Sequence, residues 1–211
     1  MGGDWTAVMP VKRLGLAKSR LRGAVPAARH ADLALAMVLD TATAVLAVCD
    51  LTVVTDDPVA AAAVAGLGAQ VVPDLPGAGL NEAMRYGADE VTGLTRRRAV
   101  LAGDLPALRP AELDEALSDV SKRAYVADAA GTGTVLLAAG PGVHLEPLFG
   151  IGSARAHAES GARALDGAWP GLRQDVDTPA DLETVLALGA GAHTCALLRD
   201  LGLKVACVSA A

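Results

Sequence analysis

Short apolar runs that alternate with longer helical patterns are the feature that most restricts the fold of this chain. Strands are predicted over residues 5–10, 51–55, 69–72 and 99–102. Helices are predicted over 30–48, over 58–66, and from the loop at 73–84 to about residue 91. Parallel strands need a long crossover connection, usually a helix, between them. The alternation therefore predicts an α/β fold with a mostly parallel central sheet flanked by helices.

The second half of the chain shows the same two kinds of element in a less regular order. A strand is predicted over 124–127, and residues 131–138 are predicted to be a Gly/Thr turn that leads into another strand. Helices are predicted from 110 and from 148–153 to about 164. A further helix is predicted to begin at Pro179, because Thr178 suits the N-cap, Pro179 the first helical position and Asp181 the third.

Composition excludes several other classes of protein. The 211 residues are 52% hydrophobic, and no apolar run approaches the roughly 18–20 residues of a membrane-spanning helix. A single domain over residues 1–211 is the expectation for this length. The net charge is −6, and the basic triplet 96–98 is expected in a solvated loop before a strand. Neither a membrane nor a nucleic acid is therefore an expected partner.

The amino-terminal residues and the cysteines predict a cytoplasmic location. Residues 1–5 lack a basic segment followed by an apolar core, so nothing indicates export. Cys49, Cys195 and Cys207 are widely spaced and form no C-x-x-C motif. This pattern is typical of reduced thiols and does not indicate a zinc site.

Asp104 closely follows a short run of small and apolar residues. The run 99–102 leads into Gly103, Asp104, Leu105 and Pro106. In open α/β sheets, ligands bind outside the carboxyl ends of the strands, where Asp104 is expected. A lone Asp in such a place is more often a turn or capping residue. Whether Asp104 binds a ligand therefore depends on whether other carboxylates lie near it.

Asp175 and Asp177 supply those acids. Because Thr178 and Asp181 account for the start of the helix, neither of the two earlier carboxylates is needed as a cap. If the segment is extended, their spacing of two places both on one face, which is unfavourable unless a cation lies between them. Mg²⁺ binds carboxylate oxygens together with substrate phosphates. Asp104, Asp175 and Asp177 are therefore predicted as magnesium ligands.

Two further segments suit anion binding. A glycine-containing loop after the first predicted strand carries the basic residues Lys12, Arg13, Lys18, Arg20 and Arg22. Such a loop can bind a triphosphate, although it lacks the Walker A pattern and is otherwise a solvated basic segment. Glycines also surround Ser153 at a predicted helix start, which suits either an anion site or a plain N-cap.

Six motifs in order resemble one family. They are P-V-K-x-L-x-x-A-K-S-R-L at 10–21, G-L-N-x-A at 79–83, G-D-L-P at 103–106, G-T-G-T at 131–134, F-G-x-x-S at 149–153 and D-V-D-T-P at 175–179. They are similar to the guanylyltransferases of deazaflavin coenzyme biosynthesis, over roughly residues 6–198. The resemblance implies a Rossmann-like nucleotidyltransferase fold. It also implies that GTP condenses with phosphoenolpyruvate or 2-phospho-L-lactate and releases pyrophosphate.

The resemblance also implies roles for individual residues. The three acids match the family's Mg²⁺ ligands, and Lys18 joins them as a catalytic residue. The phosphorylated three-carbon acid is expected at Thr134, Gly150 and Ser153, with Thr132 as a competitor for Thr134. The nucleotide is expected at Lys12, Lys18 and Asn81. Residues 199–211 match no part of the family pattern and are predicted to be a variable tail.

Other functions stay open on the residues alone. Another guanylyltransferase of the same fold would use a sugar phosphate or molybdopterin as its acceptor. A catalytically silent nucleotide-binding module is the alternative from a different class, although it has little reason to keep three acids together. Phosphoenolpyruvate is the preferred acceptor, because this Ala- and Arg-rich chain resembles bacterial members of the family.

Overall fold

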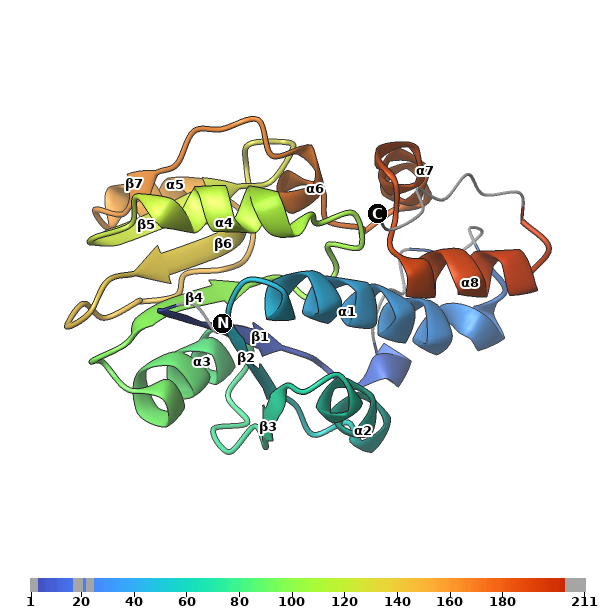
Figure 1. Ribbon diagram of the computed structural model, residues 1–211, viewed down its shortest axis with the longest axis horizontal. Coiled ribbons are helices and arrows are strands. Elements are labelled where there is room, and N and C mark those ends of the chain that lie inside the picture. Colours follow the sequence, from blue (N-terminus) through green and yellow to red (C-terminus); the bar gives the residue numbers. More distant parts are fainter. Residues whose placement is uncertain (1–3, 17–20, 22–24, 204–211) are drawn as a thin grey trace.

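Seven strands form one central sheet in the order β3-β2-β1-β4-β6-β5-β7 (Figure 1). The strands are β1 Trp5–Pro10, β2 Asp50–Val54, β3 Gln70–Val72, β4 Arg97–Leu101, β5 Arg123–Ala127, β6 Thr134–Ala139 and β7 Arg163–Ala164. All run in one direction except β6, which is antiparallel to its neighbours β4 and β5. The predicted mostly parallel α/β sheet is confirmed. The computed structural model describes residues 4–16, 21 and 25–203.

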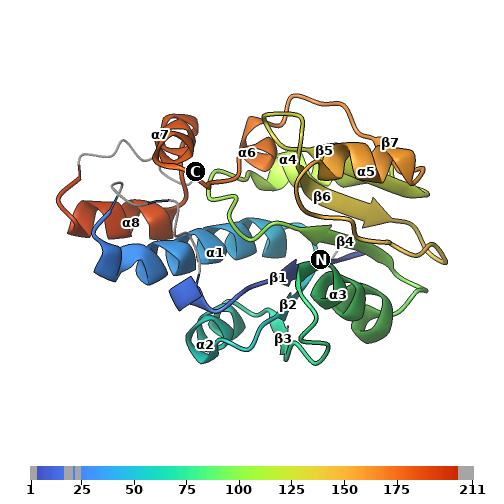
Figure 2. The same cartoon turned by 180° about the vertical axis from the view of Figure 1, so that it is seen from behind.

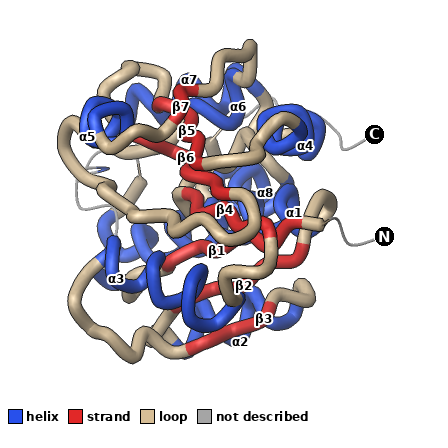
Figure 3. The backbone as a smooth tube through the Cα atoms, turned by 90° about the vertical axis from the view of Figure 1, so that its left-hand side faces the viewer, coloured by secondary structure: helices blue, strands red, loops and turns tan. Residues whose placement is uncertain are grey.

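Helices cover both faces of the sheet, as the edge-on view in Figure 3 shows. One face is covered by α1 His30–Leu46, α2 Pro58–Gly66, α4 Pro110–Ser118 and α6 Pro170–Arg173. The other face is covered by α3 Leu80–Arg85, by the π-helical continuation Tyr86–Thr92 and by α5 Ser153–Glu159. A proline stands in the first turn of α2, α4, α6 and α7, where its missing N–H costs nothing.

The C-terminal helices α7 Pro179–Leu188 and α8 Ala192–Asp200 lie beyond the sheet, on the side to which the parallel strands point (Figures 1 and 2). The predicted cap of α7 is confirmed: the Thr178 side chain accepts from the Asp181 N–H, and Asp181 accepts from Thr178 in return. Helix α8 packs on α1, and Asp200 at its end pairs with Arg29. Residues 199 and 200, expected in a variable tail, therefore belong to the fold.

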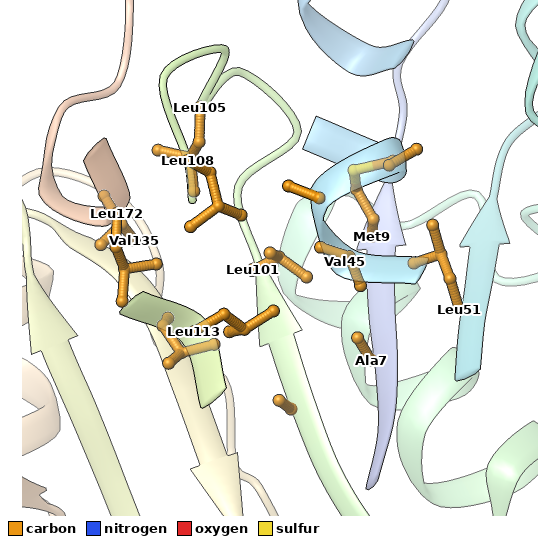
Figure 4. Close-up of a cluster of buried hydrophobic side chains, with 14 of the residues drawn as sticks. Ala7, Met9, Val45, Leu51, Leu101, Leu105, Leu108, Leu113, Val135 and Leu172 are labelled. Atoms are coloured by element: carbon orange, nitrogen blue, oxygen red, sulfur yellow. The ribbon is translucent and has the colours of Figure 1, made fainter. Parts of the chain in front are cut away.

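The buried side chains alternate between the two faces along each central strand. In β1, Ala7 and Met9 pack toward α1, while Val8 packs toward α3. Figure 4 shows the α1-side core, where Leu108 from the loop after β4 lies beside Leu172 of α6. This core continues past the end of β4, so it fixes the backbone on which Asp104 stands.

Arg98 shows that the prediction for the basic triplet was wrong. Residues 97 and 98 belong to β4, and the Arg98 side chain is fully buried. Its guanidinium forms an ion pair with buried Asp89 and donates to the carbonyl of Val143. A charged residue enters the core here because Asp89, on the π-helical turn just before β4, supplies the opposite charge, a pairing that the basic triplet alone does not reveal.

Two other predictions need correction. The helix expected to reach about residue 164 ends at Glu159, because Gly161 adopts a left-handed φ of +88° and the chain turns back into β7. Cys49 is a free, buried thiol as expected, but Cys195 is disulfide-bonded. Sequence spacing does not reveal which thiols folding brings together. Cys207 lies outside the described residues. No helix in the described ranges has both the length and the apolar composition to cross a bilayer.

Candidate active site

A cleft of about 200 Å³ opens at the carboxyl ends of β1 and β2. Its lining comes from Pro10, Val11, Lys12, Arg13, Val54, Asp56, Asp74, Gly79, Leu80 and Ala83. The cleft therefore combines the basic loop after β1 with the start of α3, the two segments predicted to hold the nucleotide. Lys12 is exposed at its edge. Lys18, the other predicted lysine, lies outside the described residues.

Asp57 anchors the basic loop to the sheet. Its carboxylate accepts the N–H of Leu14 at 2.9 Å and also caps α2 by accepting from Val59 and Ala60. The N–H groups of Ala60 and Leu14 lower the pKa of Asp57, because they stabilise the ionised form. This residue had no predicted role, although the Asp-Pro pair before α2 is a recognisable helix start.

Replacing Asp57 by Ala is expected to weaken both the helix and the loop. The free energy of unfolding should fall by about 1–2 kcal/mol through loss of the cap, and the KM for the nucleotide should rise. Because the folded-state pKa lies below the unfolded value, this contribution is present above about pH 4 and is lost as pH falls. Urea titrations at several pH values measure the first effect. Asp57→Asn keeps an acceptor for the cap and should be milder; an unchanged nucleotide KM in Asp57→Ala would contradict the anchoring role.

A larger hollow, about 330 Å³, lies at the opposite edge of the sheet. Thr6, Asp50 and Thr52 line it near the amino ends of their strands, and an ion pair between Arg96 and Asp50 lies at its border. Parallel α/β sheets bind ligands at the carboxyl ends of their strands. The smaller cleft is therefore the better candidate.

Asp104 lies just beyond β4, on the edge of the sheet that bears the cleft, and is partly exposed. Thr41, fully buried in α1, supports the backbone on both sides of it. The Thr41 hydroxyl accepts the N–H of Leu105 at 3.0 Å and approaches the carbonyl of Gly103 at 3.4 Å. Helix α1 thus positions the residue that the sequence singled out first.

Asp175 and Asp177 lie on either side of buried Val176 in the stretch between α6 and α7. Val176 packs in one apolar cluster with Ala107, which belongs to the loop after Asp104. Gly171 touches the same loop so closely that an added Cβ would lie 2.1 Å from the Ala107 carbonyl oxygen. The fold therefore places the two acidic segments side by side, and Val176 alternates with the two acids as an extended segment requires.

The three carboxylates do not form a closed cluster. Within residues 4–16, 21 and 25–203, no three His, Cys, Asp or Glu side chains are grouped so that they could hold a metal ion. Asp177 is exposed and Asp175 is half-buried. The magnesium assignment thus stays a prediction, with its residues on adjoining segments.

Thr134 begins β6 at the same edge, because this strand runs antiparallel to β4. The turn before it is held by Asp128, whose carboxylate accepts the N–H groups of Thr132 and Gly133. An added Cβ on Gly133 would lie 2.4 Å from that carboxylate, so a larger residue at this position of the G-T-G-T motif would displace the Asp128 side chain that holds the turn. Thr132 is exposed, whereas Thr134 is buried.

The acceptor loop, residues 148–153, leads from Leu148 to Ser153 at the start of α5. Gly150 and Gly152 adopt φ angles of +140° and +73°, and an added Cβ on either would meet no atom within 4 Å. The N-cap of α5 is Gly152, so the Ser153 side chain is not a cap. The alternative prediction that Ser153 is a plain N-cap is therefore wrong. The Ser153 side chain is buried.

Asn81 contacts this loop with both ends of its carboxamide. The Asn81 side chain donates to the carbonyl of Phe149 at 3.1 Å and accepts the Phe149 N–H at 2.8 Å. Asn81 was predicted near the nucleotide base; its neighbours Gly79 and Leu80 do line the cleft. In this structure it connects the start of α3 to the acceptor loop.

Comparison with known proteins agrees with this geometry. The chain shares its fold with a protein from Desulfovibrio desulfuricans assigned as a nucleotide-diphospho-sugar transferase, at a TM-score of 0.70, 21% identity and 96% coverage of both chains. A CMP:2-keto-3-deoxy-manno-octonic acid synthetase complexed with CTP gives a TM-score of 0.56 at 18% identity, over 88% of this chain and 98% of its own. The fold is that of the nucleotidyltransferases.

Sequence comparison then identifies the family. The model of the CofC-like guanylyl transferases matches residues 5–211, and this chain belongs to that family. A phosphoenolpyruvate guanylyltransferase of Salinispora arenicola is 58% identical over 92% of both chains. The enzyme of the same name from Geodermatophilus obscurus is 54% identical over 92% of this chain and 94% of its own.

Proposed function

We propose that this protein transfers the guanylyl group of GTP to phosphoenolpyruvate and releases pyrophosphate. The relatives that carry this name, 46–58% identical over nearly the whole chain, are the observation that supports the proposal most directly. The predicted nucleotide, acid and acceptor segments also lie along one edge of the sheet. The reaction forms a phosphoanhydride between the acceptor phosphate and the α-phosphorus of GTP.

The residues act mainly by positioning and by charge. The phosphate of the acceptor is already a nucleophile, so no side chain needs to remove a proton from it. The chief obstacle is the repulsion between two highly charged anions, which Lys12 and Arg13 at the cleft reduce. In-line alignment of the attacking and leaving oxygens supplies the remaining part of the rate enhancement. A cavity of about 200 Å³ is below the roughly 300–1,000 Å³ of most ligand pockets, so the phosphates are expected to extend toward Asp104.

Magnesium is part of the proposal. Asp104, Asp175 and Asp177 offer the hard oxygen donors that Mg²⁺ prefers, and the packing of Val176 near Ala107 holds their segments together. Mg²⁺ usually takes only one or two carboxylates, with waters and substrate phosphates completing its shell. An open arrangement of the three acids is compatible with this coordination, because it leaves room for waters and phosphates. When bound, the ion would neutralise charge on the phosphates.

The acceptor is tested by competition. Phosphoenolpyruvate and 2-phospho-L-lactate carry the same two anionic groups and differ only at C2 and C3. Steric differences of this kind are worth about 1–3 kcal/mol, which produces a preference and not an absolute choice. With GTP, Mg²⁺ and both acids at equal concentration, the enolpyruvate product should dominate. A product carrying lactate would correct the acceptor and leave the reaction class standing.

The other candidate functions are separated by one assay of pyrophosphate release. Each nucleoside triphosphate is incubated with Mg²⁺ and, in turn, the two acids, a sugar phosphate and molybdopterin. Release only with GTP and a three-carbon acid supports the proposal, and the product would then belong to deazaflavin coenzyme biosynthesis in the cytoplasm. Release with another acceptor, or none with any, would favour a related transferase or a silent nucleotide-binding module.

Ser153→Ala tests the acceptor site directly. The buried Ser153 hydroxyl is not a cap, so its removal should raise the KM for phosphoenolpyruvate about tenfold, the value of one hydrogen bond to a charged group. The KM for GTP should change less than twofold. Ser118→Ala, which removes an exposed hydroxyl from the end of α4, is the matched control. Equal changes in both KM values would place Ser153 outside the acceptor site.

A further inference from the structure

His157 is the fully buried side chain on which the acceptor segments meet. It lies one turn after Ser153 in α5, and its Nδ1 is 2.9 Å from the hydroxyl oxygen of Thr134. Its Nε2 accepts the backbone N–H of Leu148 at 2.9 Å. The ring of Phe149 packs edge-on against the imidazole, with 5.2 Å between centroids. None of the four histidines had a predicted role, although the spacing of four from Ser153 places both side chains on one helix face.

These contacts settle which atom carries the proton. A backbone N–H can only donate, so Nε2 of His157 accepts and carries no hydrogen. In a neutral imidazole the hydrogen then lies on Nδ1, which donates to the oxygen of Thr134. The hydroxyl of Thr134 keeps its own hydrogen for another acceptor. An anionic substrate needs such a donor.

We infer that His157 is a positioning residue for the acceptor: it orients the Thr134 hydroxyl as a donor to the phosphorylated acid and holds the acceptor loop by the Leu148 N–H. This assignment rests on the proposed function, because it names the residue that organises the same acceptor site. His157 acts through Thr134 and the loop and does not touch the reacting atoms. On the other side of the loop, Asn81 fixes the backbone of Phe149.

The surroundings of His157 keep it neutral. Burial, together with the charge of nearby Arg123, lowers the pKa of His157 to about 4. Arg123 itself pairs with Glu146 and donates to Ser160, and the Tyr125 ring lies 5.9 Å from the imidazole. A hydrogen bond from the ring to the backbone of Ser153 acts in the opposite direction but does not outweigh burial. The neutral imidazole has one donor nitrogen and one acceptor nitrogen, as the contacts with Thr134 and Leu148 require. A doubly protonated ring would lose the bond from Leu148.

Three substitutions separate the two hydrogen bonds. His157→Phe keeps an aromatic ring against Phe149 and removes both bonds. His157→Asn places an amide nitrogen near the position of Nδ1, so it can still donate to Thr134. His157→Gln places a carbonyl oxygen near the position of Nε2, so it can still accept from Leu148. Steady-state KM values for phosphoenolpyruvate and for GTP are measured for each, with the melting temperature recorded as well.

We expect His157→Phe to raise the KM for phosphoenolpyruvate at least about tenfold and the KM for GTP less than twofold. His157→Asn should recover more of the acceptor KM than His157→Gln does. Thr134→Val should raise the acceptor KM similarly, and the double variant with His157→Phe should be no worse than the more severe single variant. Ser160→Ala, which removes a hydrogen bond to the backbone of His157 without touching Thr134, is the control.

Several results would overturn the assignment. If His157 only stabilised the fold, the increase in the acceptor KM would follow the decrease in melting temperature, equally in His157→Asn and in His157→Gln. Equal changes in both KM values, or multiplicative effects of the two substitutions, would also exclude an action through Thr134. Thr134→Val tests the same link should His157→Phe fail to fold. Wild-type protein that released pyrophosphate with neither three-carbon acid would overturn the proposed function itself, and this assignment with it.

Discussion

Asp104→Asn, Asp175→Asn and Asp177→Asn should each lower kcat/KM at least about a hundredfold while leaving the fold intact. The expected reason is loss of charge stabilisation at the phosphates, where a metal ion contributes several kcal/mol, and each 1.36 kcal/mol corresponds to tenfold in rate. Asn has nearly the shape of Asp, so the packing of Val176 near Ala107 should survive. The measurement is pyrophosphate release as a function of Mg²⁺ concentration.

The matched control is Asp114→Asn, an exposed acid on α4. It removes the same charge at a position away from the cleft and should leave activity within twofold. Free energies of unfolding, measured in urea, should differ from the wild type by no more than about 1 kcal/mol in all four variants. Turnover of the wild type without a divalent ion, or an active Asp177→Asn, would disprove the magnesium assignment.

Local patterns predicted most of the fold because the signals that begin and end these elements lie within a few residues of each other. The cap of α2 at Asp57 and Pro58 and the reciprocal cap of α7 at Thr178 and Asp181 are of this kind. Apolar runs identified the central strands for a similar reason: each is buried on both faces. Such features need no knowledge of distant residues.

The reversed strand and the early end of α5 could not be predicted in this way. Strand β6 runs antiparallel because a short turn at Asp128 returns the chain beside β5, and its apolar residues would suit either direction. Helix α5 ends at Glu159, where Arg123 from β5 donates to the carbonyl of Ser160. The turn before β6 is held by contacts four and five residues apart, whereas the end of α5 combines the left-handed Gly161 with the contact from Arg123 on a distant strand.

The residues of the candidate site also fall into two groups, those recognisable from local sequence and those that only the structure reveals. The acids and the glycines were proposed because their residue types stand out at strand ends and helix starts. Thr41 and His157 were not, since each acts from inside a helix on segments outside that helix: Thr41 on Leu105, and His157 on Leu148 and Thr134. A buried Thr or His in a helix has no local signature that distinguishes a supporting residue from an ordinary core residue. The structure shows that Thr41 supports the backbone beside Asp104 and that His157 supports the loop at Leu148.

Arg98→Met should cause the largest loss of stability, about 3–5 kcal/mol in the free energy of unfolding. Arg98 is fully buried, and the side chain of its partner Asp89 is only 8% exposed. Removal of the guanidinium leaves the Asp89 carboxylate buried, and among the residues that the structure describes its remaining partner is the largely exposed ring of His144 at 3.1 Å. It also frees the carbonyl of Val143. Equilibrium unfolding in urea measures the loss.

Arg96→Met is the matched control. Arg96 lies two residues before Arg98 in the sequence and forms an exposed ion pair with Asp50. Exposed pairs contribute about 0–1 kcal/mol, so this variant should stay close to the wild type. The double variant Arg98→Met, Asp89→Leu should recover part of the loss, since no buried charge remains; a double variant less stable than both single ones would contradict this account of the pair.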